Sequence, residues 1–223
     1  MFLSTAISAQ IINGSFEEKG VDPGSFMTLN EGDISSVYGW TIEAGSVDYI
    51  GNYWEASNGV RSIDLNGYYA KATISQTIAN TIPGVTYQVT FDLSGNPDGD
   101  PVTKSVTVGV NGNAATESIF TYTVDPLVNA HDNMLYASNT YYFVATGTST
   151  VLRFTSNTNF LDGNASAFGP VLDNVAMTNI TAPICHLDSG KRTQKTIIVG
   201  VSAIPAHTAH GDKVGPCSVV PTV

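Results

Sequence analysis

Apolar and polar residues alternate along most of the chain, and this period of two predicts β-strands. In GVRSIDLNG, residues 59–67, Ile63 and Leu65 share one face and the polar residues between them share the other. This segment is therefore expected to be a half-buried strand with one packed side and one solvated side. Similar runs occupy residues 39–54, 69–79, 85–93, 104–112, 118–124, 140–145, 151–155 and 169–180.

The run from Val85 to Leu93 gives the clearest core strand, because every second residue in it is apolar. Only 13% of all residues are charged and 21 are glycine, which favours short strands joined by tight turns over helices. No amphipathic helix longer than two turns is evident, and residues 20–38 are expected to form a loop. We therefore predict an all-β fold with one main β-sandwich domain in this chain of 223 residues.

The net charge of −10 is concentrated in the first four fifths of the chain. Residues 1–182 carry 17 acidic and 5 basic residues, whereas residues 183–223 carry 2 acidic and 4 basic residues. An acidic body without a basic stripe argues against contacts to a phosphate backbone, so we expect no nucleic-acid partner. The same charge argues against binding to anionic membranes.

The first nine residues, MFLSTAISA, resemble the end of a secretory signal peptide that lacks its basic start. The alternative is that residues 2–7 form a first strand. No later stretch approaches the ~18 consecutive apolar residues of a membrane helix. The protein is therefore expected to be secreted and extracellular, or associated with a cell surface, without membrane insertion.

Aromatic residues are dense in the first third of the chain and suggest a sugar-binding face. Trp40 begins a strand and is expected in the core, where its indole N–H needs one partner. Other aromatics lie in segments rich in Gly, Asn and Ser, which predict exposed loops where rings can stack on sugars. The candidate ligand-binding residues are Trp54, Tyr68, Tyr69, Tyr49 and Arg61.

The segment SGNPDGDP, residues 94–101, places Asn96, Asp98 and Asp100 at every second position. Oxygen ligands with this spacing open many calcium loops. The same residue types are also the commonest turn formers, and the flanking helices of an EF-hand are absent. A plain turn is the favoured interpretation, with a calcium loop as the alternative.

Several short motifs, in this order, resemble a known family. NGSFEE, GWTIEAGSVDYIG, GVRSIDLNG, DLSGNPDG and GPVLDNVAMT are similar to motifs of the bacterial secreted choice-of-anchor C family, which is related to the DUF642 domains of plant cell walls. The resemblance spans about residues 10–180. It implies a galactose-binding-like jelly roll, an extracellular location, no catalysis, and a polysaccharide or cell-wall glycan as the partner.

The resemblance also implies a structural Ca²⁺ where the first and last strands meet. Glu17 of NGSFEE and Asp173 of VLDNV match the carboxylates that usually serve it. The alternation falters at Asp173, as a bulge or a ligand position would cause. Because Ca²⁺ takes six to eight oxygens, backbone carbonyls would have to complete the site. The alternative is that both are ordinary strand-end carboxylates.

The tail, residues 183–223, differs from the rest because it holds both cysteines and three of the four histidines. In an exported protein, Cys185 and Cys217 most simply form a disulfide that staples a segment too small for its own core. Alternatively, zinc or copper is bound there, with Asp212 or the thiolates as further ligands. A disulfide consumes both thiols, whereas a thiolate-ligated metal needs them reduced. The candidate histidine ligands are His186, His207 and His210.

The expected organisation is a signal remnant at 1–9, a jelly-roll sandwich at 10–182 and the Cys/His tail at 183–223. The first hypothesis for function is a non-catalytic carbohydrate-binding module. The second is a structural or adhesive surface protein that self-associates and has no sugar affinity. The third is a glycosidase that uses two carboxylates, although no spacing in the sequence singles out such a pair.

Overall fold

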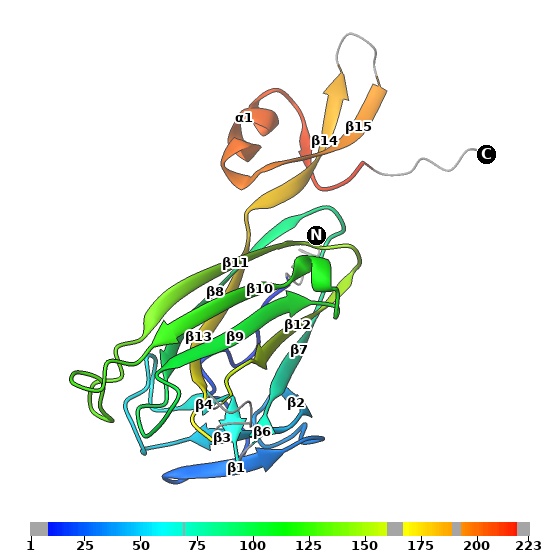
Figure 1. Ribbon diagram of the computed structural model, residues 1–223. Helices are drawn as coiled ribbons and strands as arrows, with labels where there is room; N and C mark the ends of the chain where they lie inside the picture. Colours follow the sequence, from blue (N-terminus) through cyan, green and yellow to red (C-terminus); the bar gives the residue numbers. More distant parts are fainter. Residues whose placement is uncertain (1–8, 69, 160–166, 189–192, 218–223) are drawn as a thin grey trace.

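The computed structural model describes residues 9–68, 70–159, 167–188 and 193–217, and it confirms the all-β prediction. Two antiparallel sheets face each other in a jelly-roll sandwich, and a smaller sheet with one short helix stands at one end (Figure 1). Residues 1–8, most of the expected signal remnant, lie outside the described residues. The signal peptide and the alternative first strand therefore stay predictions.

Each sheet of the sandwich is a continuous antiparallel ladder. The larger sheet has the order β1 (Phe26–Asn30), β3 (Ser46–Ile50), β4 (Ser62–Asp64), β13 (Pro170–Asn179), β8 (Thr86–Gly95) and β11 (Ala137–Val144). The smaller sheet has the order β10 (Ser118–Thr123), β9 (Thr103–Val110), β12 (Ser149–Ser156), β7 (Thr73–Ala79) and β2 (Thr41–Ala44). A short hairpin of β5 (Asn66–Gly67) and β6 (Ala70–Lys71) links them.

The core lies between these sheets and is built from the alternating apolar residues. Val85 and the four core-facing residues of β8 are at most 3% exposed, as the sequence pattern predicted. Phe91 of the larger sheet meets two rings of the smaller sheet edge-on, Phe120 at 5.1 Å and Phe154 at 5.2 Å between centroids. Trp40 is also buried, and its indole N–H donates to the carbonyl of Asn13 at 3.0 Å. The ring contacts of Phe91 join the two sheets across the core.

The outer face of the larger sheet corrects one expectation. Ile63 and Leu65 do enter the core, but the polar residues that alternate with them are fully buried rather than solvated. Loops cover this face, and a second apolar cluster of Ile50, Trp54, Met134 and Val171 packs there. Strand periodicity separates two faces, but it does not show what covers the outer one.

Residues 20–38 were expected to form a loop, and this was wrong in part. Phe26–Asn30 form β1, an edge strand paired with β3 from Phe26↔Ile50 to Asn30↔Ser46. Four of the five residues of β1 are exposed. An edge strand has only one partner, so its own sequence need not show a buried face.

The third sheet contains most of the Cys/His tail that the structure describes. β14 (Thr181–Asp188) follows β13 after a single residue and pairs with β15 (Thr193–Gly200) and β16 (Lys213–Val214). Two short turns of 3-10 helix, at Ala114–Thr116 and Val201–Ala203, and the helix α1 (Ile204–Ala209) complete the described elements. Within the described residues, no helix is long and apolar enough to cross a membrane.

Phe91→Ala tests the packing between the sheets. Removal of this ring should lower the free energy of unfolding by about 3 to 5 kcal/mol, because Phe91 is 1% exposed and its two ring neighbours are lost. Tyr142→Ala, on the adjacent strand but 55% exposed, should change it by about 0.5 kcal/mol or less. Urea unfolding followed by tryptophan fluorescence measures both, and equal losses would contradict this account of the core.

Candidate functional site

An aromatic group lies in the loop between β3 and β4, over the outer face of the larger sheet. Tyr53 is at its centre, with ring centroids 5.3 Å from Trp54, 5.2 Å from Phe26 and 4.5 Å from His131. Trp54 packs into the second apolar cluster beneath. The loop therefore presents aromatic surface on an apolar base.

Tyr53 lines two hollows. The larger is an open cleft of about 560 Å³ and the smaller has a volume of about 140 Å³. A volume of several hundred Å³ is in the range of small-ligand sites. The cleft is lined by Gly51, Asn52, Tyr53, Trp54, Glu55, Ala56, Gly59, Val60, His131 and Asp132, and the smaller hollow includes Phe26, Asp48, Asp98 and Phe168.

The carboxylate of Asp98 fixes two of these rings. Its Oδ2 accepts a hydrogen bond from the Tyr53 hydroxyl at 3.0 Å, and its Oδ1 lies 2.7 Å from His131 Nε2. Asp98 itself is held in its turn, where its backbone N–H donates to the side chain of Asn96 at 2.9 Å. Asp98 therefore connects the loop after β8 to Tyr53 and to His131, which lie in two other loops.

Carboxylates on the sheet hold the cleft loop from below. Asp173 Oδ2 accepts the backbone N–H of Asn58 at 2.8 Å, and Asp92 Oδ2 accepts the hydroxyl of Ser57 at 2.6 Å. The backbone N–H groups of a loop have no neighbouring strand to accept their hydrogen bonds, so side-chain carboxylates accept them instead. Although burial opposes this, hydrogen-bond donors, Ser57 among them, hold the pKa of Asp92 below its usual value, and bonds to a charged acceptor are stronger than neutral ones.

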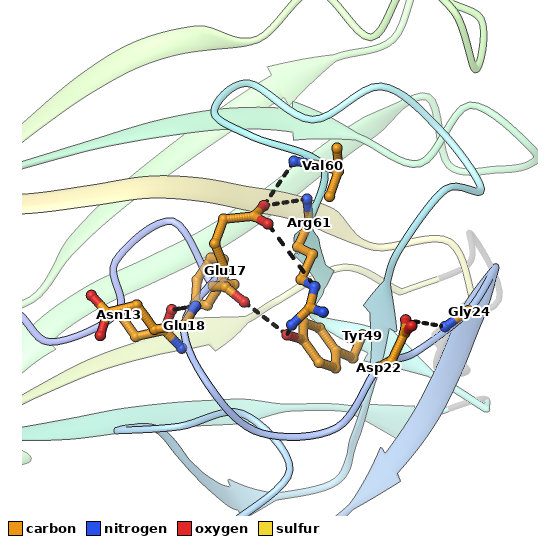
Figure 2. A network of polar contacts seen from close by, with 9 residues as sticks. Asn13, Glu17, Glu18, Asp22, Gly24, Tyr49, Val60 and Arg61 are labelled. Carbon is orange, nitrogen blue, oxygen red and sulfur yellow. Dashed lines mark hydrogen bonds and ion pairs between the residues drawn. The ribbon is translucent and has the colours of Figure 1, made fainter.

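Glu17 holds the end of the same loop (Figure 2). Its Oε1 accepts the backbone N–H groups of Val60 at 2.8 Å and Arg61 at 2.6 Å. Gly59 has a φ of +76°, and a Cβ there would lie 2.5 Å from Glu17 Oε1. The positive φ favours glycine at this position, and any larger residue would also have to displace the Glu17 carboxylate.

The structure corrects two candidate sugar-contact residues. Tyr49 is fully buried, and its hydroxyl donates to the carbonyl of Phe16 at 2.7 Å. Trp54 was expected to be exposed but is 5% exposed, and its indole N–H donates to Ser62 Oγ at 2.9 Å. Tyr49 is a core residue, and Trp54 lines the cleft but is almost fully buried.

The other three candidates have different positions. Arg61 is half-buried beneath the loop, where Nη1 donates to the hydroxyl of Tyr49 at 2.8 Å and Nε lies 4.0 Å from Glu17 (Figure 2). Tyr68 is 76% exposed, but it does not line either hollow. Tyr69 lies outside the described residues.

Sequence reasoning missed Tyr53, Phe26 and His131 as residues of this site, and it considered Asp98 only as part of a turn or calcium loop. Tyr53 adjoins Trp54, and this was the one local signal that could have identified it. The other three come from distant segments and reach Tyr53 only in the folded chain.

Glu17 and Asp173, the expected calcium ligands, lie beneath the same loop, but their described neighbours do not suit a cation. Each carboxylate faces backbone N–H groups, and Glu17 also lies near the guanidinium of Arg61. Ca²⁺ requires converging oxygens rather than donors. The bulge expected at Asp173 is confirmed by a register shift between Asp173 and Ala176.

A buried ammonium occupies the centre of the acidic turn at 94–101. Lys104 is fully buried, and its Nζ donates to the carbonyls of Gly99 and Phe168, both at 2.8 Å. Burial lowers the pKa of Lys104 to about 8. One carbonyl oxygen of the turn, that of Gly99, thus accepts a hydrogen bond from a lysine and is not free to face a cation.

Two carboxyl groups under the loops have raised pKa values. Burial raises the pKa of Asp64 to about 8 and that of Asp173 to about 7, and hydrogen-bond donors oppose both shifts. Asp64 accepts from Asn96 Nδ2 at 2.8 Å and from the backbone N–H of Gly169 at 3.0 Å. Neither group lines the cleft, so these shifts do not assign an acid or a base to it.

In the tail, the disulfide prediction is confirmed, because Cys185 and Cys217 are bonded. The histidines divide into two kinds. His186 and His207 lie with Asp212 in a cluster whose nitrogen and oxygen atoms are within 4.8 Å of one another. His210 caps the end of α1 and is not in that cluster.

A family model described as "Protein of unknown function (DUF642)" matches residues 9–178. Halomucin of Haloquadratum walsbyi is 38% identical over 68 residues, which cover 28% of this chain and 1% of halomucin. The matched segment is therefore a very small part of that relative.

Distant structural similarity extends to several carbohydrate-binding modules. CBM35 from Paenibacillus barcinonensis has a TM-score of 0.43 and 17% identity, covering 68% of this chain and 98% of that one. TmCBM61 in complex with β-1,4-galactotriose has a TM-score of 0.43 and 11% identity, covering 75% and 95%. The CBM22-1 xylan-binding domain from Paenibacillus barcinonensis Xyn10C has a TM-score of 0.40 and 13% identity, covering 69% and 92%.

The raised pKa values make stability depend on pH. Between about pH 5 and about pH 7, the folded chain keeps protons on Asp64 and Asp173 that the unfolded chain has released, since unfolded aspartates titrate near 3.8. The free energy of unfolding should therefore fall as pH rises through this window, by on the order of 1 kcal/mol per pH unit for each group. Urea unfolding at a series of pH values measures the slope.

Asp173→Asn should flatten this slope, whatever it does to stability at any one pH. Glu31→Gln, at an exposed position in the loop after β1, is the matched control and should keep the wild-type slope. A wild-type slope of zero, or one that Asp173→Asn leaves intact, would contradict the assignment.

Proposed function

The chain belongs to the DUF642 family, and we propose that it is a non-catalytic carbohydrate-binding module of a secreted or cell-surface protein. The observation that carries this proposal is the open cleft of about 560 Å³ with Tyr53 as its aromatic wall. The proposed ligand is a segment of a polysaccharide or cell-wall glycan that lies against this ring.

The chemistry of the cleft suits a sugar. The C–H face of a pyranose is apolar and can pack on the Tyr53 ring, while its hydroxyl groups need partners at the edges. Asn52, Glu55 and Asp132 line the cleft and can exchange hydrogen bonds with hydroxyls. Asp98 keeps the Tyr53 ring in place, so the platform exists before the ligand arrives and little ordering cost remains.

Two features support an extracellular setting for this binding. The disulfide between Cys185 and Cys217 is a bond that persists in oxidising compartments. An acidic, sparsely charged surface favours solubility outside the cell. The assignment to the choice-of-anchor C group remains a prediction. So does the structural Ca²⁺, although the backbone donors around Glu17 and Asp173 argue against it, and a loss of sugar binding in EDTA would favour it.

A structural or adhesive role without sugar affinity is the second candidate. The observation in its favour is the loop before β11, where Leu127 is 94% exposed and Val128 and Leu135 are 47% and 49% exposed. Exposed apolar side chains of this kind can mediate self-association. Sedimentation of the chain over a range of concentrations measures this property independently of sugars.

Tyr53→Ala is the decisive substitution. We expect the full chain to bind at least one glycan or insoluble polysaccharide, and Tyr53→Ala to weaken binding by about tenfold or more because the stacking surface is lost. Tyr53→Phe removes only the bond to Asp98 and should have a smaller effect. A glycan array and polysaccharide pull-down, each with calcium and with EDTA, measure these changes.

Tyr142→Ala is the matched control, since this exposed tyrosine lies outside both the cleft and the smaller hollow. It should bind like the unmodified chain, and circular dichroism should show that every variant is folded. No binding to any sugar in either condition, or equal losses for Tyr53→Ala and Tyr142→Ala, would reject the cleft as a glycan site.

A further inference from the structure

His186, His207 and Asp212 form a second group of functional side chains, in the third sheet and away from the aromatic cleft. His186 lies on β14, His207 on α1, and Asp212 immediately before β16. We call these three residues the His/Asp cluster. It shares no residue with the cleft, so its chemistry is independent of the proposed glycan binding.

The local fold explains why these residues meet. β14 pairs with β16 through Cys185↔Lys213, and one further step along this antiparallel ladder places Asp212 opposite His186. The turn after α1 is closed by a bond from the Asp212 N–H to the carbonyl of His207 at 3.1 Å. The disulfide from Cys185, next to His186, to Cys217 closes the segment that carries the cluster.

Both imidazoles converge on one carboxylate oxygen. His186 Nδ1 lies 2.9 Å and His207 Nδ1 lies 2.7 Å from Asp212 Oδ2, and the two rings are perpendicular with centroids 6.0 Å apart. The other oxygen, Oδ1, accepts the Leu187 N–H at 2.9 Å.

We propose that the His/Asp cluster is a binding site for a divalent first-row transition metal ion, with Zn²⁺ as the ion it suits best. Two imidazole nitrogens and one carboxylate oxygen are ligands that zinc takes in open, three-residue protein sites. Zinc bonds of about 2.0 Å place tetrahedral ligands about 3.3 Å apart. The two nitrogen–oxygen distances of 2.9 and 2.7 Å are shorter than this, while all ligand atoms of the cluster lie within 4.8 Å of one another. Rotation of the rings, with the proton of each imidazole moved from Nδ1 to Nε2, would let both nitrogens and the carboxylate face one ion.

The exposure of the cluster leaves room for further ligands. The Asp212 side chain is 2% exposed, whereas those of His207 and His186 are 26% and 44% exposed. The carboxylate forms the floor of the site and the imidazoles form its rim. An ion held by all three would complete its coordination with water or with a group from another molecule.

The disulfide defines the chemistry of this site. With both cysteines bonded to each other, no thiolate is available, so the ligand set is nitrogen and oxygen only. The disulfide and a metal were alternatives in the sequence, but in the structure they occupy adjacent and separate positions. Metal binding should therefore occur in the oxidised chain and should not require a reductant.

The test is calorimetric titration of the oxidised full chain, without a polyhistidine tag, with ZnCl₂. We expect one saturable site per chain, and His186→Gln and His207→Gln should each weaken binding by at least about tenfold through the lost ligand. Gln at 207 can still donate to Asp212, which keeps the segment folded. His210→Gln, three residues along but outside the cluster, is the matched control and should bind zinc normally.

Cobalt substitution gives a second readout that does not depend on affinity. The Co²⁺ complex should show visible bands without the near-ultraviolet charge transfer that a thiolate ligand produces. Thiol titration and circular dichroism should show an intact disulfide and fold in each variant. Non-saturable zinc binding, binding unchanged by His207→Gln, or equal losses for His210→Gln would each overturn the proposal as adventitious binding to surface histidines.

Discussion

The hydrogen bonds that three carboxylates accept from one loop are the interaction on which the candidate site depends. Asp92, Asp173 and Glu17 accept hydrogen bonds from residues 57–61, a segment with no strand partner of its own. That segment fixes the loop that carries Tyr53. The arrangement has a cost, because burial opposes ionisation of Asp173, and the loop donors recover only part of it. The geometry of the cleft is therefore coupled to the protonation state of Asp173 in the sheet beneath it.

Much of the fold could be predicted because strand periodicity records burial directly. The stripe from Val85 to Leu93, the core position of Trp40 and the irregularity at Asp173 all followed from local pattern. The covered outer face of β4 could not be predicted in this way. Period two assigns residues to two faces, and loops from elsewhere in the chain decide whether the second face meets water. The edge strand β1 was missed for a related reason: its residues do not alternate between buried and exposed, and only its pairing with β3 makes it a strand.

The candidate sites could be predicted only in part, because their residues come from segments that meet only in the folded chain. Tyr53 became central because Phe26, His131 and Asp98 reach it from three other segments, and no spacing along the chain relates these positions. In the tail, the concentration of histidines was evident in the sequence. The ladder between β14 and β16 was needed to select Asp212 as the common partner and to separate His210 from the cluster.

The path of the chain into the third sheet has a mechanical consequence. β14 continues from β13, which lies inside the larger sheet between β4 and β8. A pull applied beyond Cys217 would pass through the disulfide to Cys185, so the intervening residues carry little tension. The load then acts along β13, parallel to the strand. The hydrogen bonds from β13 to β4 and β8 would then be loaded together in shear rather than broken one at a time. The connection between the sandwich and its tail should therefore resist a high pulling force.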